Sequence, residues 1–188
     1  MTRTFAAIFP PRETIVALSE LVEKLRKLCP GVKWVENEHM HLTLRFFGDL
    51  TDEQVEAATR CVREFAQSEG AFRARLGAVG AFPSPSRARV IWVGVDDGRE
   101  RLVNVATALE ERFVKAGLGQ TDKPFSPHLT VGRIRIPGRS PELEEAIRAL
   151  TFSEGEFMIE ALSLTKSELT PRGPIYSPLT VAELGRPD

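Results

Sequence analysis

The sequence has few of the features that mark secreted, membrane-spanning or disulfide-stabilised proteins. Its 188 residues include two cysteines, Cys29 and Cys61, which form no CxxC pair and are too few for a disulfide framework. No apolar run approaches the roughly 20 residues that a membrane span needs, and the N-terminus lacks the apolar core and cleavage site of a signal peptide. We therefore expect a cytoplasmic protein with no membrane partner, in which both cysteines are structural.

An excess of charge of one sign is also missing. The formal net charge is −1, from 25 Lys and Arg against 26 Asp and Glu. This balance argues against a protein that coats nucleic acid through a basic field over its whole surface. It leaves a local basic cleft open, so the positions of the arginines matter more than their sum.

Several well-known catalytic and nucleotide-binding motifs are absent. The chain has no GxGxxG after a strand, no GxxxxGK[ST] loop and no GxSxG elbow. His39 and His41 form an HxH pair like that of some zinc sites, but Glu36 and Glu38 are its only neighbours with ligand chemistry. We predict no metal and no cofactor, and we expect His39 to face solvent or to support a site indirectly.

One short pattern occurs twice, as HLTL at 41–44 and HLTV at 128–131, and it uses two of the three histidines. In each copy polar and apolar residues alternate with period two, which predicts a β-strand. In that geometry His41 and Thr43 share one face, and His128 and Thr130 do the same. Each tetrad thus presents an imidazole beside a hydroxyl.

The elements expected around the two tetrads repeat in the same order. A strand at 4–9, a helix at 12–28, the first tetrad, a helix that Thr51 caps and a strand at 71–79 form one unit. A strand at 89–95, a helix at 99–116, the second tetrad, a helix at 141–150 and a strand at 156–166 form the other, and a last strand covers 175–184. The repeats span about 4–80 and 89–166. An approximate two-fold axis between such units would bring the tetrads face to face.

Two facing pairs of histidine and threonine fit acid–base chemistry at phosphorus. An imidazole titrates near pH 6.5, so at neutral pH one copy is able to accept a proton while the other donates one. Displacement at phosphorus needs both roles, on opposite sides of the phosphate. Each hydroxyl can donate to a non-bridging oxygen. We therefore predict His41, His128, Thr43 and Thr130 as catalytic residues.

A structural role is the ordinary reading of a single histidine in a strand. Two copies at equivalent points of a repeated pattern favour a joint role instead. Strict alternation also places Arg45 on the face of His41 and Thr43. We expect the Arg45 charge to bind substrate in the same cleft or to lie at its rim.

The tandem tetrads resemble the two HxTx signatures of the 2H phosphoesterase superfamily. Longer stretches are more specific and cover essentially the whole chain: WV at 34–35, HLTLRFFG at 41–48, FSPHLTVGR at 125–133, LTKS at 164–167 and GPIY at 173–176. They resemble the bacterial and archaeal RNA 2′,3′-cyclic phosphodiesterases, historically called 2′-5′ RNA ligases. The position of Arg45 is often small or apolar in these relatives.

The resemblance implies an α+β fold with two pseudo-symmetric lobes, in which two antiparallel sheets line a central cleft and helices lie outside. Residues 1–188 would form one domain whose lobes exchange strands. It also implies metal-independent hydrolysis of an RNA 2′,3′-cyclic phosphate to a 2′-phosphomonoester. His41 would protonate the leaving 3′-oxygen, His128 would accept a proton from water, and Thr43 and Thr130 would hold phosphate oxygens.

Two further positions lie five residues after the histidine of each tetrad. They are Phe46 and Arg133, which in similar proteins approach the nucleotide, so we expect both to bind substrate by stacking or charge. Strict alternation would place them on the face opposite the histidines. We therefore expect each strand to twist, bulge or end nearby, as Gly48 and Gly132 would permit.

The expected partners are RNA ends that carry a 2′,3′-cyclic phosphate, with tRNA fragments as one candidate source, and the expected state is a monomer. Five arginines flank the second half and predict a track for the RNA backbone: Arg87, Arg89, Arg133, Arg135 and Arg139. Two alternatives stay open. One is ATP-independent 2′-5′ RNA ligation at the same site, and the other is a non-catalytic module that binds RNA ends.

Overall fold

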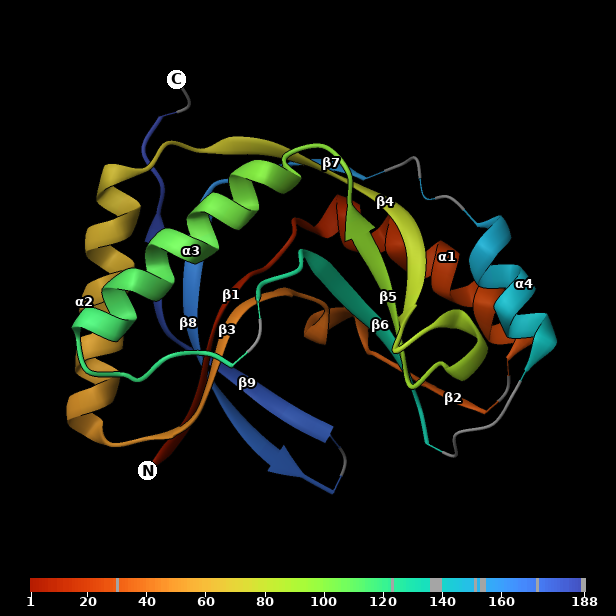
Figure 1. Cartoon of the computed structure of the whole chain (residues 1–188), viewed down its shortest axis with the longest axis horizontal. Coiled ribbons are helices and arrows are strands. Elements are labelled where there is room, and N and C mark those ends of the chain that lie inside the picture. Colours follow the sequence, from red (N-terminus) through yellow and green to blue (C-terminus); the bar gives the residue numbers. More distant parts are fainter. Residues whose placement is uncertain are drawn as a thin grey trace.

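A computed structural model of the chain describes residues 1–29, 31–122, 124–135, 140–150, 152, 155–171 and 173–186. Arg139, a member of the expected arginine track, lies outside the described residues. Within the described residues, four α-helices surround a strongly curved antiparallel sheet (Figure 1). The predicted α+β class is confirmed.

The strands are β1 (Thr2–Ile8), β2 (Val32–Trp34), β3 (Leu42–Leu50), β4 (Phe72–Phe82), β5 (Val90–Val95), β6 (His128–Ile134), β7 (Glu156–Ile159), β8 (Ala161–Thr170) and β9 (Gly173–Glu183). The helices are α1 (Arg12–Leu28), α2 (Asp52–Ser68), α3 (Arg99–Lys115) and α4 (Pro141–Ala149). Two short 3-10 helices, η1 (Asn37–His39) and η2 (Pro85–Arg87), lie in the connections.

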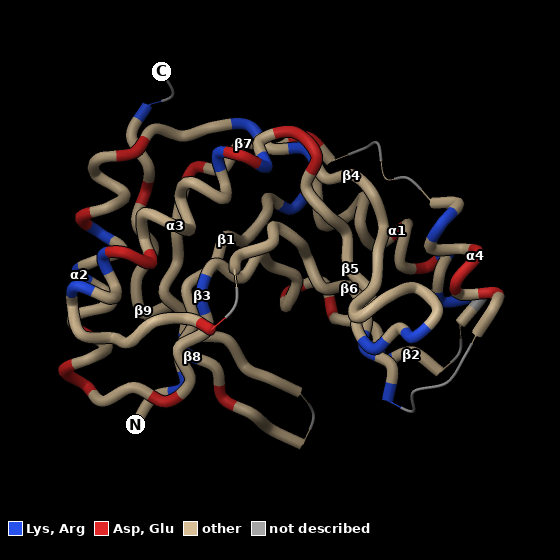
Figure 2. Tube along the Cα trace, in the orientation of Figure 1, with Lys and Arg blue, Asp and Glu red and all other residues tan. Residues whose placement is uncertain are grey.

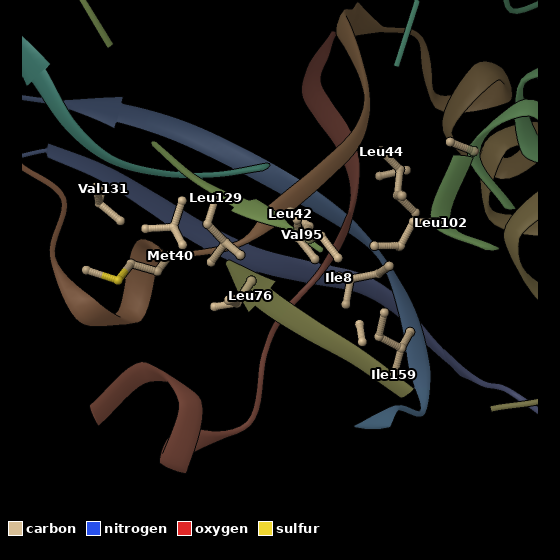
Figure 3. Packing of buried hydrophobic residues seen from close by; sticks show 14 of the residues in the cluster. Ile8, Met40, Leu42, Leu44, Leu76, Val95, Leu102, Leu129, Val131 and Ile159 are labelled. Atoms are coloured by element: carbon tan, nitrogen blue, oxygen red, sulfur yellow. The ribbon is translucent and has the colours of Figure 1, made fainter. Parts of the chain in front are cut away.

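The sheet has two halves that meet at the tetrads. Its order is β7-β4-β5-β6-β3-β1-β8-β9, and β2 pairs with β6. The halves join between β3 and β6, where Leu42 pairs with Leu129. Both leucines are fully buried among apolar side chains such as Ile8 and Val95 (Figure 3). The two sheets that the resemblance implies therefore form one continuous sheet in this protein. They join through a short junction whose leucine side chains pack in the core.

The last strand of each repeat lies in the other half of the sheet. β4, which ends the first repeat, pairs with β5 of the second, and β8 pairs back with β1. The prediction of one strand over 156–166 is wrong, because the chain breaks at Glu160 into two strands. β7 pairs with β4 and β8 pairs with β1. Since these partners belong to different halves, one straight strand cannot reach both.

Local signals place the helix ends as the sequence predicts. The Thr51 hydroxyl accepts from the Gln54 backbone amide at 3.2 Å, and the Gln54 side chain accepts from the Thr51 amide at 3.0 Å, which is a capping box. The Ser140 hydroxyl accepts from the Leu143 amide at the start of α4. These caps satisfy amide groups that the first helical turn leaves without partners.

The helices cover the outside of the two halves. α2 packs on β8 and β9 and beside α3, while α4 packs on β4 and beside α1 (Figure 1). Cys29 and Cys61 are buried free thiols, as expected of structural residues. Among the helices that the structure describes, none combines the length and apolar character needed to cross a membrane.

Candidate active site

The pairing of β3 with β6 brings the two tetrads together. Leu42 and Leu129 are the second residues of the two tetrads, and they pair with each other. A local two-fold axis therefore passes between them. In an antiparallel pair the flanking positions then face their counterparts, so His41 lies opposite Thr130 and Thr43 lies opposite His128. All four side chains line one cavity of about 260 Å³.

Both imidazoles are oriented in the same way by their own backbone. Nδ1 of His41 lies 2.7 Å from the His39 carbonyl oxygen, and Nδ1 of His128 lies 2.7 Å from the Ser126 carbonyl oxygen. A carbonyl oxygen can only accept, so Nδ1 carries the proton in each ring. Nε2 is therefore the nitrogen that each neutral ring offers for proton transfer.

Aromatic rings surround both imidazoles. His41 lies 4.8 Å from Phe5 and 5.4 Å from Tyr176 between ring centroids, and Phe9 is also 5.4 Å away. On the other side, the His128 ring lies 5.1 Å from the ring of Phe82. These contacts restrict the rotation of the imidazoles and exclude water from one side of each.

Burial lowers the pKa of both imidazoles below the ordinary value of 6.5. The positive charge of Arg133 lowers the pKa of each further, and His39 and His128 add to this at His41. The backbone hydrogen bond acts in the opposite direction in both cases, because it favours the charged ring. The free site thus favours two neutral histidines until an anion enters.

A β-bulge lies at the fourth residue of each tetrad. In β3 the register with β1 moves from Thr43 to Arg45 and leaves Leu44 unpaired. In β6 the register with β5 moves from Thr130 to Gly132 and leaves Val131 unpaired. An extra residue reverses the alternation beyond it. The expectation that the strands bulge near these positions is confirmed.

Arg45 does not reach the site, so the prediction that it binds substrate or lies at the cleft rim is wrong. The bulge at Leu44 turns its side chain to the opposite face, where it is 7% exposed and forms an ion pair with Glu110. Its Nη2 donates to the carbonyl oxygens of Leu118 at 2.9 Å and Gly119 at 3.1 Å. Arg45 instead ties β3 to the connection that leads into β6.

Phe46 and Arg133 come to the face of the histidines through the same bulges, but they differ in position. Arg133 lines the cavity, and its role in binding substrate stays a prediction. Phe46 is half exposed and is not among the residues that line the cavity, and the Arg3 guanidinium lies 4.5 Å from its ring centroid. Of the predicted residues, the structure thus gathers His41, Thr43, His128, Thr130 and Arg133 around one space.

The cavity has further walls whose residues the sequence analysis did not assign to the site. Lys33 pairs directly with Arg133 across β2 and β6, so two cations face the cavity from neighbouring strands. Tyr176, the only tyrosine, packs edge-on against His39 and His41. Trp34 lines the cavity with a buried indole N–H that has no hydrogen-bond partner in the described structure. The available signals were the stretches WV at 34–35 and GPIY at 173–176, which carry part of the family resemblance.

His39 supports the site, as one of its two expected roles requires. Its carbonyl oxygen orients His41, and its half-buried side chain lines the cavity. Among the described residues, no three His, Cys, Asp or Glu side chains lie close enough together to hold a metal ion. The cavity thus combines three imidazoles, two threonine hydroxyls and two cations, a set suited to a phosphate ester.

Comparison with known proteins agrees with this arrangement. The family model of the 2′-5′ RNA ligase superfamily matches residues 11–171. The chain is 35% identical over 168 residues to the RNA 2′,3′-cyclic phosphodiesterase of Methanothermobacter thermautotrophicus, covering 89% of this chain and 90% of the relative. It is 38% identical over 154 residues to that of Archaeoglobus fulgidus, covering 81% and 84%.

Solved structures share the fold. The crystal structure of TT0787 of Thermus thermophilus superposes with a TM-score of 0.84 at 32% identity, covering 98% of both chains. The apo structure of Escherichia coli LigT superposes with a TM-score of 0.81 at 22% identity, also over 98% of both chains. The resemblance drawn from the paired tetrads is confirmed: the chain belongs to the 2′-5′ RNA ligase superfamily.

Proposed function

We propose that this protein hydrolyses the terminal 2′,3′-cyclic phosphate of RNA to a 2′-phosphomonoester by acid–base catalysis with two histidines and no metal. The observation that carries the proposal is the symmetric pair of imidazoles. Each has its Nδ1 held by a backbone carbonyl, and both line one cavity together with Thr43 and Thr130. The curated relatives bear the name of this activity.

The proposed reaction is an in-line displacement at phosphorus. His128 Nε2 accepts a proton from water as the water oxygen bonds to phosphorus. The bond from phosphorus to the 3′-oxygen breaks, and His41 Nε2 gives that oxygen a proton. The phosphate stays on the 2′-oxygen. One proton has passed from water to His128, and another has passed from His41 to the 3′-oxygen. The acid and base assignment follows the family resemblance.

The remaining groups would stabilise the phosphate. The hydroxyls of Thr43 and Thr130 are placed to donate to non-bridging oxygens, which gain charge in the transition state. Arg133 and Lys33 add positive charge at the cavity wall. A bound phosphate anion would also raise the pKa of a nearby imidazole. It would therefore favour the protonated His41 that the leaving oxygen requires.

We also propose that the lobes act as one unit, as a single domain of two pseudo-symmetric parts. The exchange of β4 and β8 between the halves supports this, because neither repeat completes its own half of the sheet. Each half supplies one histidine and one threonine. Neither tetrad is expected to catalyse the reaction alone.

A product analysis with excess chelator tests the proposed function. We expect an oligoribonucleotide with a 2′,3′-cyclic phosphate to be converted to the 2′-phosphate. We expect His41→Ala and His128→Ala each to lower turnover by about 10³-fold or more. Full turnover by either folded variant contradicts the mechanism. Tight binding of RNA ends without turnover at any pH favours a non-catalytic module, and joining to an RNA with a 5′-hydroxyl favours ligation.

A further inference from the structure

Five cations gather at one end of the molecule. Two of them, Lys33 and Arg133, line the cavity. The other three are Arg87, Arg89 and Arg135, which we call the outer basic patch. All three are exposed. Among the described residues, none of the five takes part in an ion pair with a carboxylate.

Six other arginines of the described chain do form an ion pair with a carboxylate. They are spread over the rest of the fold: Arg26, Arg45, Arg73, Arg75, Arg101 and Arg148. A chain with 26 acidic residues has enough carboxylates to partner many of its cations. What distinguishes the outer basic patch is that its three arginines, unpaired among the described residues, lie beside Lys33 and Arg133 on neighbouring segments, in a protein that is slightly acidic overall.

The outer basic patch is continuous with the cavity along the sheet. Lys33 pairs with Arg133 across β2 and β6, and Val90 pairs with Arg133 from the other side. The carbonyl oxygen of Arg89 then accepts from the Ile134 amide at 2.9 Å, and Arg135 follows in the chain. Arg87 ends η2, just before β5. Figure 2 shows Lys and Arg gathered where η2, β2 and the end of β6 meet.

The opposite side of the cavity has a different character. There the wall comes from Gly173, Pro174 and Tyr176 of β9, and in the described part of the neighbouring strand β8 Lys166 is paired with Glu168. A second groove, of about 510 Å³, continues from Tyr176 along β8 and β9, and it contains Glu38 and Glu160 but no Lys or Arg among its described lining residues. A phosphate chain would be attracted toward the patch and not toward this groove.

We propose that the outer basic patch binds the phosphates of nucleotides that lie on the 5′ side of the terminal cyclic phosphate. This inference rests on the proposed function, and it makes an oligoribonucleotide the preferred substrate over a free cyclic nucleotide. Arginine suits the role because its planar fork donates two parallel hydrogen bonds to phosphate. The three arginines are exposed and form no ion pair with a described carboxylate, so binding breaks none. RNA thus leaves the cavity along β6 and η2.

The test compares one variant on two substrates. The variant is Arg87→Gln, Arg89→Gln and Arg135→Gln combined, and the substrates are a 2′,3′-cyclic mononucleotide and a pentaribonucleotide that ends in a 2′,3′-cyclic phosphate. A matched control is Arg60→Gln, which removes one exposed arginine from α2, on the other half of the molecule. KM and kcat are measured for both substrates between about 50 and 200 mM salt.

We expect KM for the pentaribonucleotide to rise about tenfold in the triple variant, as the loss of three modest charge contacts implies. Each lost phosphate contact should also reduce the slope of log KM against log salt by about 0.7. KM for the mononucleotide and kcat for both substrates should stay unchanged, and Arg60→Gln should change neither substrate.

Two results would overturn the inference. An unchanged KM for the pentaribonucleotide would show that the phosphates pass elsewhere. An equal loss on both substrates would show that the patch supports the cavity and not the chain beyond it. If the wild-type protein hydrolyses neither substrate, the proposed function fails separately. Fluorescence anisotropy with a labelled pentaribonucleotide 2′-phosphate then still compares binding by the wild-type and triple-variant proteins, and equal affinity rejects the patch.

Discussion

At the scale of single residues, the site depends on groups that hold other groups in place. The carbonyl oxygens of His39 and Ser126 determine which nitrogen of each imidazole is protonated. These acceptors lie two residues before the histidines in both halves, so the same local geometry occurs twice. A backbone acceptor cannot be removed by substitution of a side chain, which makes this orientation robust.

The hydroxyls of Thr43 and Thr130 give a prediction at this scale. Thr43→Val and Thr130→Val remove a donor while they keep the branched shape, so each should lower kcat by about 10²-fold. Thr→Ser at the same positions keeps the hydroxyl and should retain most of the activity. Steady-state kinetics on a cyclic nucleotide measure both. Equal losses for Val and Ser would assign the threonines a packing role instead.

The lowered pKa values of the two histidines predict how stability depends on pH. In the unfolded chain each imidazole titrates near 6.5, whereas in the folded protein its pKa is lower. Between these values the unfolded state binds more protons, so the free energy of unfolding should fall as the pH falls below about 6.5. It should be insensitive to these groups above that range.

Thermal unfolding at a series of pH values from about 5 to about 8 measures this effect. The double variant His41→Gln and His128→Gln serves as the control, because it removes both titrating rings and should flatten the curve below about pH 6.5. If the stability of the wild-type protein rose on acidification relative to the double variant, the folded-state pKa values would have to be raised instead of lowered.

At the scale of elements, the two bulged strands are the main structural device. Each bulge reverses the alternation of side chains between the two faces of the strand beyond the threonine. The fourth residue after each histidine therefore turns away from the cleft, and the fifth turns toward it. Gly132 follows the bulge in β6, and a Cβ there would lie 2.8 Å from Val32 Cγ1 and 3.0 Å from Trp34 Cε3. The glycine thus lets β2 approach β6 and bring Lys33 and Trp34 to the cavity.

Arg45 gives a prediction at the scale of elements. Arg45→Met would leave the Glu110 carboxylate and the carbonyl oxygens of Leu118 and Gly119 without this donor. We expect the free energy of unfolding to fall by about 3 kcal/mol, as when one partner of a buried ion pair is lost. Urea denaturation measures this change. The double variant Arg45→Met and Glu110→Gln should be less destabilised than the sum of the single variants.

Enzyme kinetics with Arg45→Met separate the two readings of this residue. A positioning role predicts little change in KM for the folded variant, since Arg45 does not line the cavity. A large rise in KM with unchanged stability would instead restore the reading from strict alternation, in which Arg45 binds substrate.

At the scale of the whole molecule, strand exchange makes the two repeats depend on each other. β1 needs β8 from the second repeat, and β4 of the first repeat needs β5. α2 likewise packs on β8 and β9, which follow it by about a hundred residues in the chain. The site inherits this dependence, because the histidines and threonines proposed as catalytic lie where the halves join.

Splitting the chain in the η2 connection tests this dependence. Fragments 1–84 and 85–188 should not unfold cooperatively when each is alone, because each loses strand partners and exposes apolar surface. Co-expression should restore part of the phosphodiesterase activity by pairing the exchanged strands. Circular dichroism melts and activity assays measure both. A sharp thermal transition for fragment 1–84 alone would show that the first repeat folds independently.

The sequence by itself determined the helices, most of the strands and the four side chains that are proposed to react. Period-two alternation placed His41 and Thr43 on one face, and the Thr51 cap placed the start of α2. These signals are local, since they arise from backbone geometry within a few residues. The repeat of pattern also indicated that the two tetrads act together.

Only the tertiary structure decided the roles of Arg45, Tyr176 and the segment at 156–166. Arg45 changes face because β1 pairs with β3 through a bulge, and a bulge depends on the partner strand. Tyr176 reaches His41 through the pairing of β9, β8 and β1. The break at Glu160 follows from partners in different halves of the sheet. All three depend on contacts between residues far apart in the chain, which no local pattern encodes.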